Sequence, residues 1–148
     1  MAEEGTIYTA TATWTSGLQF VVVAEKSGIA AVLDGSPEHG GNGTGMRPME
    51  ALLASLATCT GMDVISILRK KRQKVTGFTI HVRGTRQDEH PRIYTEIELE
   101  FVVRGYDVSE EAVARSIELS QTKYCGVTNS LKAPVTYTYR VEAEQAPA

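Results

Sequence analysis

The chain has 148 residues, a formal net charge of −3 and two cysteines. This length suits one domain with a core large enough to fold alone, and the weak negative charge gives no general affinity for nucleic acids. Two cysteines are too few for the disulfide framework of a small secreted protein, and we find neither a secretory signal nor an uninterrupted apolar stretch of about 18 residues that would span a membrane. We therefore expect a single domain over residues 1–148 in a reducing, cytoplasmic compartment.

The N-terminal third predicts three short strands and a loop. β-Branched and aromatic residues dominate 6–15 and 18–24, and a third strand is expected over 29–33. Five of the thirteen glycines lie in 34–45, so we expect a flexible loop there. The loop lacks the lysine and the spacing of a phosphate-binding loop, which makes phosphate binding a poor interpretation.

A long apolar helix is predicted next, over residues 48–72. Pro48 and Glu50 suit its first turn, and the basic residues at 69–72 suit its last turn. Between them Asp63 is the one charged residue in 51–68, and apolar residues cover more than one face, which is typical of a buried helix. At this length the helix would span almost 40 Å. We therefore expect a break in it, a partner chain against it, or both.

The rest of the chain alternates strands and helices. Period-2 alternation predicts two long strands, 75–86 and 92–104, joined by a polar turn. Ser109 is a suitable N-cap for a second helix that runs to about residue 123, and a short third helix fits 127–132. A last strand is expected over 133–141 and a disordered tail over 142–148. This order predicts the α+β class, with an antiparallel sheet and helices to one side.

Chemistry-bearing residues are few. The histidines, His39, His81 and His90, are scattered, and neither cysteine has a second cysteine at metal-binding spacing, so we predict no metal site and no cofactor. No nucleophile-elbow pattern supports a serine hydrolase. Cys59 and Cys125 remain. A free cysteine is most often a small apolar core residue, but the small and hydroxylic neighbours of Cys59 favour a reactive site.

Two charged residues at the start of the long helix bear on Cys59. A guanidinium near a thiol favours the reactive thiolate, which makes Arg47 a candidate, with Glu50 beside it. The simpler interpretation is a solvated loop charge and a carboxylate that favours the helix dipole. Glu50 and Cys59 are nine residues apart and so lie on opposite faces of one ideal helix. They can meet only if the helix breaks or a second chain supplies one of them.

Two segments carry a family resemblance, residues 47–64 (RPMEALLASLATCTGMDV) and residues 123–131 (KYCGVTNSL). Together they resemble the OsmC/Ohr family of osmotically inducible and organic hydroperoxide resistance proteins, and the similarity covers nearly the whole chain. The resemblance implies an OsmC-like fold: an intertwined α+β homodimer with the long helix buried at its centre and the active sites at the interface. It also implies that Cys59 is the peroxidatic thiol, Cys125 the resolving thiol and Glu50 the active-site glutamate.

By this resemblance the Cys59 thiolate would attack an organic hydroperoxide, or more weakly hydrogen peroxide, and the resulting sulfenic acid would condense with Cys125 to a disulfide. An external dithiol, in this family often a lipoyl protein, would reduce that disulfide. Organic hydroperoxide resistance members carry an active-site arginine in the N-terminal strands. This chain has no arginine before Arg47, which is the candidate replacement. Two alternatives stay open: a non-catalytic dimer that binds a small apolar ligand, and a redox-sensing protein.

Overall fold

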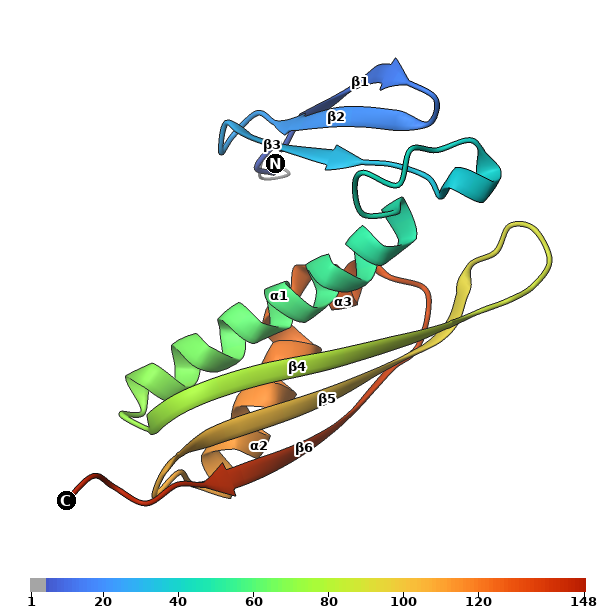
Figure 1. Ribbon diagram of the computed structural model, residues 1–148. Coiled ribbons are helices and arrows are strands. Elements are labelled where there is room, and N and C mark those ends of the chain that lie inside the picture. Colours follow the sequence, from blue (N-terminus) through green and yellow to red (C-terminus); the bar gives the residue numbers. More distant parts are fainter. Residues whose placement is uncertain (1–4) are drawn as a thin grey trace. The chain divides into compact units, whose positions relative to one another are not determined.

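The computed structural model describes residues 5–148 as two compact units, of which the first ends at Leu52 and the second runs from Leu53 to Ala148 (Figure 1). The first unit holds a three-stranded antiparallel sheet of β1 (Ala10–Ser16), β2 (Gln19–Ala24) and β3 (Ile29–Leu33), in that order. The three predicted strands are therefore confirmed, although β1 begins at Ala10, later than the expected residue 6.

Asp34 organises the glycine-rich loop that follows β3. Its side chain is buried, and its carboxylate accepts hydrogen bonds from the backbone N–H groups of Gly35, Asn42 and Thr44. The Thr44 hydroxyl adds a further bond of 2.6 Å. The loop also contains one 3₁₀ turn, Pro37–His39. The glycines suggested a flexible loop, but the buried carboxylate gives it a defined conformation, because each bonded N–H fixes the backbone at that point.

Helix α1 (Pro48–Lys70) runs without a break, so of the two alternatives offered for its length, a break or a partner chain, the break is excluded. Within the second unit its buried positions are Leu56, Thr60, Val64 and Leu68, which are spaced by four residues and therefore form one stripe. On the opposite face the Met62 side chain is 69% exposed. Within the second unit the helix is therefore buried on one side, whereas the sequence predicted burial nearly all round.

The second sheet has the order β4-β5-β6, with β4 (Lys74–Arg86), β5 (Tyr94–Tyr106) and β6 (Val135–Ala143). β4 and β5 form the predicted antiparallel hairpin, but β6 pairs with β5 in parallel. The predicted α+β class is confirmed, but the chain forms two sheets in place of one, and the second sheet includes a parallel pair. The parallel pairing arises because the chain crosses through three helical segments between β5 and β6 and returns to the same end of the sheet.

Those three segments are α2 (Glu110–Leu119), a π-helical turn called η2 (Ser120–Tyr124) and α3 (Gly126–Ser130). Ser109 caps α2 as predicted, because its hydroxyl accepts a 3.2 Å bond from the N–H of Ala112. β6 includes Glu142 and Ala143, which the sequence analysis assigned to a disordered tail. The N–H of Glu144 also bonds to the carbonyl of Gly105 at 2.8 Å.

The core of the second unit lies between β5, α1 and α2. It is formed by buried apolar residues of these three elements: Leu56, Val64, Leu68, Ile97, Leu99, Phe101, Val103, Val113 and Ile117. β5 supplies the largest share because it is the central strand of its sheet. In the described part of the first unit, by contrast, no apolar side chain reaches full burial.

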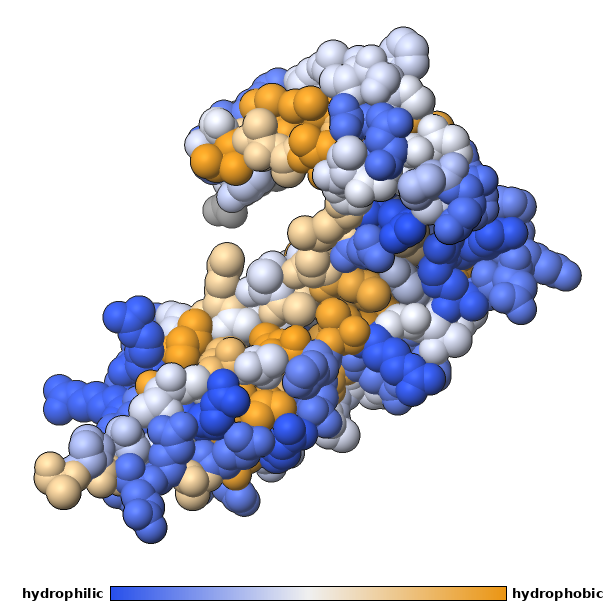
Figure 2. Space-filling model, in the orientation of Figure 1, coloured by the Kyte–Doolittle hydropathy of each residue, from blue (hydrophilic) through white to orange (hydrophobic). Residues whose placement is uncertain are grey.

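Both units leave apolar surface uncovered (Figure 2). In the first unit Trp14 is 61% exposed and Ile29 is 66% exposed. No membrane-spanning stretch was expected from the sequence, yet α1 is long and apolar enough to cross a membrane by length and composition, with a mean hydropathy of 1.7. A core helix of a soluble protein meets the same criterion, so this property alone does not assign α1 to a membrane.

Candidate active site

The second unit brings the two cysteines together. Cys59 lies on α1 and is half-buried, whereas Cys125 lies between η2 and α3 and is fully buried, and both are free thiols. Burial raises the pKa of the Cys125 thiol, and a hydrogen bond and charge interaction with the adjacent Cys59 raise that pKa further. The two thiol groups are therefore neighbours in the second unit.

Thr128 supplies the hydrogen bonds to Cys125. Its hydroxyl lies 3.1 Å from the Cys125 sulfur and its backbone N–H lies 3.3 Å from it. Both donors favour the negatively charged form of the sulfur and therefore oppose the effect of burial on the Cys125 pKa. The net direction is still upward, because burial is the larger effect. Cys125 is consequently held as a buried, protonated thiol, and Cys59 is the more accessible of the pair.

A buried polar contact joins the helix of Cys59 to the segment of Cys125. The hydroxyls of Thr60 on α1 and Ser120 on η2 lie 2.7 Å apart, and both side chains are completely buried. Ser120 also donates to the carboxylate of Asp63 at 2.8 Å, and the amide of Gln121 donates to Thr60 at 2.9 Å. Sequence reasoning did not assign a site role to this cluster. The sequence feature that could have revealed this cluster is the occurrence of Thr60 and Asp63 inside an otherwise apolar helix.

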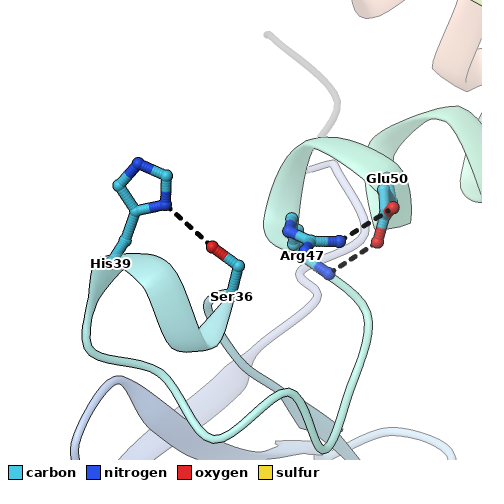
Figure 3. A network of polar contacts seen from close by, with 4 residues as sticks. All are labelled: Ser36, His39, Arg47 and Glu50. Atoms are coloured by element: carbon cyan, nitrogen blue, oxygen red, sulfur yellow. Dashed lines mark hydrogen bonds and ion pairs between the residues drawn. The ribbon is translucent and has the colours of Figure 1, made fainter.

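Arg47 and Glu50 form a pair at the start of α1, in the first unit (Figure 3). The guanidinium of Arg47 lies 3.4 Å from the carboxylate of Glu50, and both side chains are 54% exposed. Glu50 also accepts a 3.0 Å bond from the backbone N–H of Arg47. Because Arg47 immediately precedes the helix, this is one half of a capping box, so Glu50 has a structural role at the helix start as well as any chemical one.

The structure thus groups the four predicted site residues into two pairs, Cys59 with Cys125 and Arg47 with Glu50. The unbroken helix removes one of the two ways in which Glu50 and Cys59 could meet, a break in the helix between them. The other way, in which a partner chain supplies one of the residues, stays a prediction.

The histidines lie outside the cysteine pair. In the glycine loop, the Nδ1 atom of His39 lies 2.8 Å from the hydroxyl of Ser36 (Figure 3). His81 is on β4, and His90 precedes Pro91 in the turn between β4 and β5. Over the described residues 5–148, no three His, Cys, Asp or Glu side chains are grouped in a way that could hold a metal ion.

Comparison with known proteins identifies the family of this chain. The sequence pattern of the family described as OsmC-like protein matches residues 40–140. The chain is 36% identical over 133 residues to protein YhfA of Escherichia coli strain K12, which covers 90% of this chain and 96% of YhfA. The chain therefore belongs to the OsmC-like family.

Solved structures agree with this assignment at the level of the fold. A hypothetical protein from Aquifex aeolicus VF5 is 30% identical, with a TM-score of 0.83 over 95% of this chain and 100% of that one. An organic hydroperoxide resistance protein OsmC from Legionella pneumophila gives a TM-score of 0.64 at 12% identity, over 94% of this chain and 98% of that one. The second likeness concerns the fold alone, because the identity is low.

Proposed function

We propose that this OsmC-like protein is a thiol-dependent peroxidase that reduces organic hydroperoxides, and more weakly hydrogen peroxide. The observation that carries the proposal is the contact between the two thiols, one half-buried and one fully buried. Family membership supports it as well, since structural neighbours include proteins named for organic hydroperoxide resistance.

In the first step the Cys59 thiolate attacks the terminal oxygen of R–O–OH. The O–O bond breaks, the Cys59 sulfur keeps the terminal oxygen as a sulfenic acid, and the alkoxide leaves as an alcohol after it takes up a proton. The sulfur is oxidised by two electrons and the peroxide is reduced by two. Cys59 is the proposed peroxidatic residue because its side chain is the more accessible of the two.

In the second step the Cys125 sulfur attacks the sulfur of the sulfenic acid. The S–O bond breaks, a Cys59–Cys125 disulfide forms, and hydroxide leaves as water with the proton that Cys125 gives up. An external dithiol, such as a lipoyl group on a protein, then reduces the disulfide by thiol exchange. A cytoplasmic location suits this cycle, since thiol reductants are maintained there.

We propose further that the functional form is a homodimer. The open face of α1, marked by Met62, and the uncovered apolar residues of the first unit provide the surface for a second copy. In this arrangement the Arg47–Glu50 pair of one chain would serve the Cys59 of the other. That assignment would overcome the distance that an unbroken α1 imposes between Glu50 and Cys59 of one chain.

The test measures the intact mass of fully reduced protein after one equivalent of cumene hydroperoxide, for the wild type, Cys59→Ser and Cys125→Ser. The proposal predicts a loss of two hydrogens in the wild type, an added oxygen in Cys125→Ser and no prompt change in Cys59→Ser. An unchanged wild-type mass would refute the peroxidase and favour a binding role. Oxidation of the wild type without turnover in excess dithiol would favour a redox sensor.

A further inference from the structure

A continuous chain of hydrogen bonds runs from the Cys125 sulfur to the Asp63 carboxylate. In order, it joins six side chains: Cys125, Thr128, Gln121, Thr60, Ser120 and Asp63. The heavy-atom distances along it are 3.1, 3.4, 2.9, 2.7 and 2.8 Å. All six residues belong to the second unit, and three of them, Cys125, Thr60 and Ser120, are completely buried. The chain includes the sulfur that acts in the second step proposed above.

The direction of each proton in this chain follows from the number of donors. The Ser120 hydroxyl donates to the Asp63 carboxylate, so its single proton points to Asp63. Ser120 can then only accept from Thr60, so the proton of Thr60 points to Ser120. Thr60 is left as an acceptor, which requires Gln121 to present its NH₂ group to it, as observed.

These proton directions also determine where the carbonyl oxygen of the Gln121 amide points. With its NH₂ group toward Thr60, Gln121 presents its carbonyl oxygen to the hydroxyl of Thr128, 3.4 Å away. The same hydroxyl lies 3.1 Å from the Cys125 sulfur. Thr128 has one hydroxyl proton and two acceptors within reach, so Gln121 and Cys125 compete for it.

We propose that Thr128 is a catalytic residue of the disulfide-forming step and that Gln121 positions it. While Cys125 is a thiol, the Thr128 proton is divided between the Gln121 carbonyl oxygen and the Cys125 sulfur. As Cys125 loses its proton and attacks the Cys59 sulfenic acid, the Thr128 hydroxyl rotates and donates to the developing thiolate. The backbone N–H of Thr128 is a second donor that needs no movement. This inference rests on the peroxidase proposed above, but its central claim concerns Cys125 alone.

The geometry predicts effects of opposite sign for two variants. Thr128→Val keeps the shape of the side chain and removes the donor, so the pKa of Cys125 rises. Gln121→Met removes the competing acceptor and leaves the Thr128 proton to the sulfur, so the pKa of Cys125 falls. A role confined to holding the fold would not produce opposite shifts from two substitutions in one network.

The first measurement is independent of peroxide chemistry. The ultraviolet absorbance of the Cys125 thiolate is titrated in a Cys59→Ser background, which removes the neighbouring thiol that also influences Cys125. Thr128→Val, Thr128→Ser and Gln121→Met are compared with Thr122→Val. Thr122 is the matched control because it is exposed on η2 and its hydroxyl bonds to the carbonyl of Glu118. We expect a rise for Thr128→Val, a fall for Gln121→Met and no change for Thr128→Ser or Thr122→Val.

The second measurement follows the two oxidation steps by rapid mixing with cumene hydroperoxide in the full-length protein with both cysteines. We expect Thr128→Val to slow disulfide formation about ten-fold, the effect of one lost bond to a charged sulfur, and to leave formation of the sulfenic acid unchanged. If the wild type does not react with peroxide, the peroxidase proposal fails and the titration alone decides the role of Thr128. Equal Cys125 pKa values in Thr128→Val, Gln121→Met and the control would overturn the inference.

Discussion

The hydrogen bond between Thr60 and Ser120 permits a quantitative test of how α1 is held against η2. Thr60→Val keeps the volume of the side chain and removes its hydroxyl, and Ser120→Ala removes the opposite hydroxyl. Both side chains are completely buried and their oxygens lie 2.7 Å apart, so water cannot replace either partner. The two single variants and the double variant form a double-mutant cycle.

The expected magnitudes follow from the bonds that each variant loses. Thr60→Val loses the bond to Ser120 and leaves the amide of Gln121 without its acceptor, which should cost about 1–2 kcal/mol. Ser120→Ala loses the bond to Thr60 and the bond to a carboxylate, so its cost should be higher, about 2–4 kcal/mol. The double variant should fall short of the sum by about 1 kcal/mol, because the shared bond is then lost only once.

Chemical unfolding measures these free energies, with every variant at one protein concentration because association would add to stability. Thr58→Val is the matched control, since Thr58 is exposed on the same helix and bonds to the carbonyl of Ala54. Its effect should stay within about 0.5 kcal/mol. Strict additivity of Thr60→Val and Ser120→Ala would show that the two hydroxyls do not interact in solution. The proton order derived for the hydrogen bonds between Cys125 and Asp63 would then be wrong.

Two further predictions concern the first unit. Hydrogen bonds from the loop, led by the one from the Thr44 hydroxyl, hold the pKa of Asp34 below its ordinary value. The ionised Asp34 therefore stabilises the fold at pH values above the pKa it has in the unfolded chain. This stabilisation is lost as the pH falls through the lower pKa of the folded protein. Asp34→Asn should therefore lower the melting temperature at neutral pH, and the difference from wild type should shrink in acid; the exposed Asp88→Asn should show neither effect. Arg47→Met should slow the oxidation of Cys59 by hydroperoxide about ten-fold or more if a guanidinium favours the thiolate. Arg115→Met is its control, because Arg115 also forms an exposed pair with a glutamate three residues later, and equal rates for these two variants would remove Arg47 from the mechanism.

Local patterns in the sequence predicted much of the fold. Period-2 alternation gave the hairpin of β4 and β5 to within two residues at each end, and Ser109 marked the start of α2 because an N-cap is a local signal. The pairing of β6 with β5 was missed, since no local pattern states whether two distant strands run parallel. Of the two explanations offered for the length of α1, the break is excluded by the continuous helix, and the partner chain stays a prediction.

The candidate site was likewise predicted in part from local sequence patterns and in part missed. The cysteines were found from their motifs, and their adjacency follows from packing between α1 and η2. Thr128, three residues after Cys125, was missed because a threonine in a short helix has no distinctive pattern. Asp34 was predicted only as the first residue of a flexible loop. Its five bonding contacts come from residues up to ten positions away, and only the folded loop brings them together.

The parallel pairing of β5 with β6 also bears on the order of folding. Ile97 pairs with Val135, so this ladder closes a loop that contains α2, η2 and α3, whereas β4 and β5 are joined by a short turn. Loop-closure entropy makes the hairpin the earlier event and the docking of β6 the later one. The segment that carries Cys125 is therefore anchored at both ends only when the last strand docks. The pair of thiols is therefore completed late in folding, when β6 docks on β5.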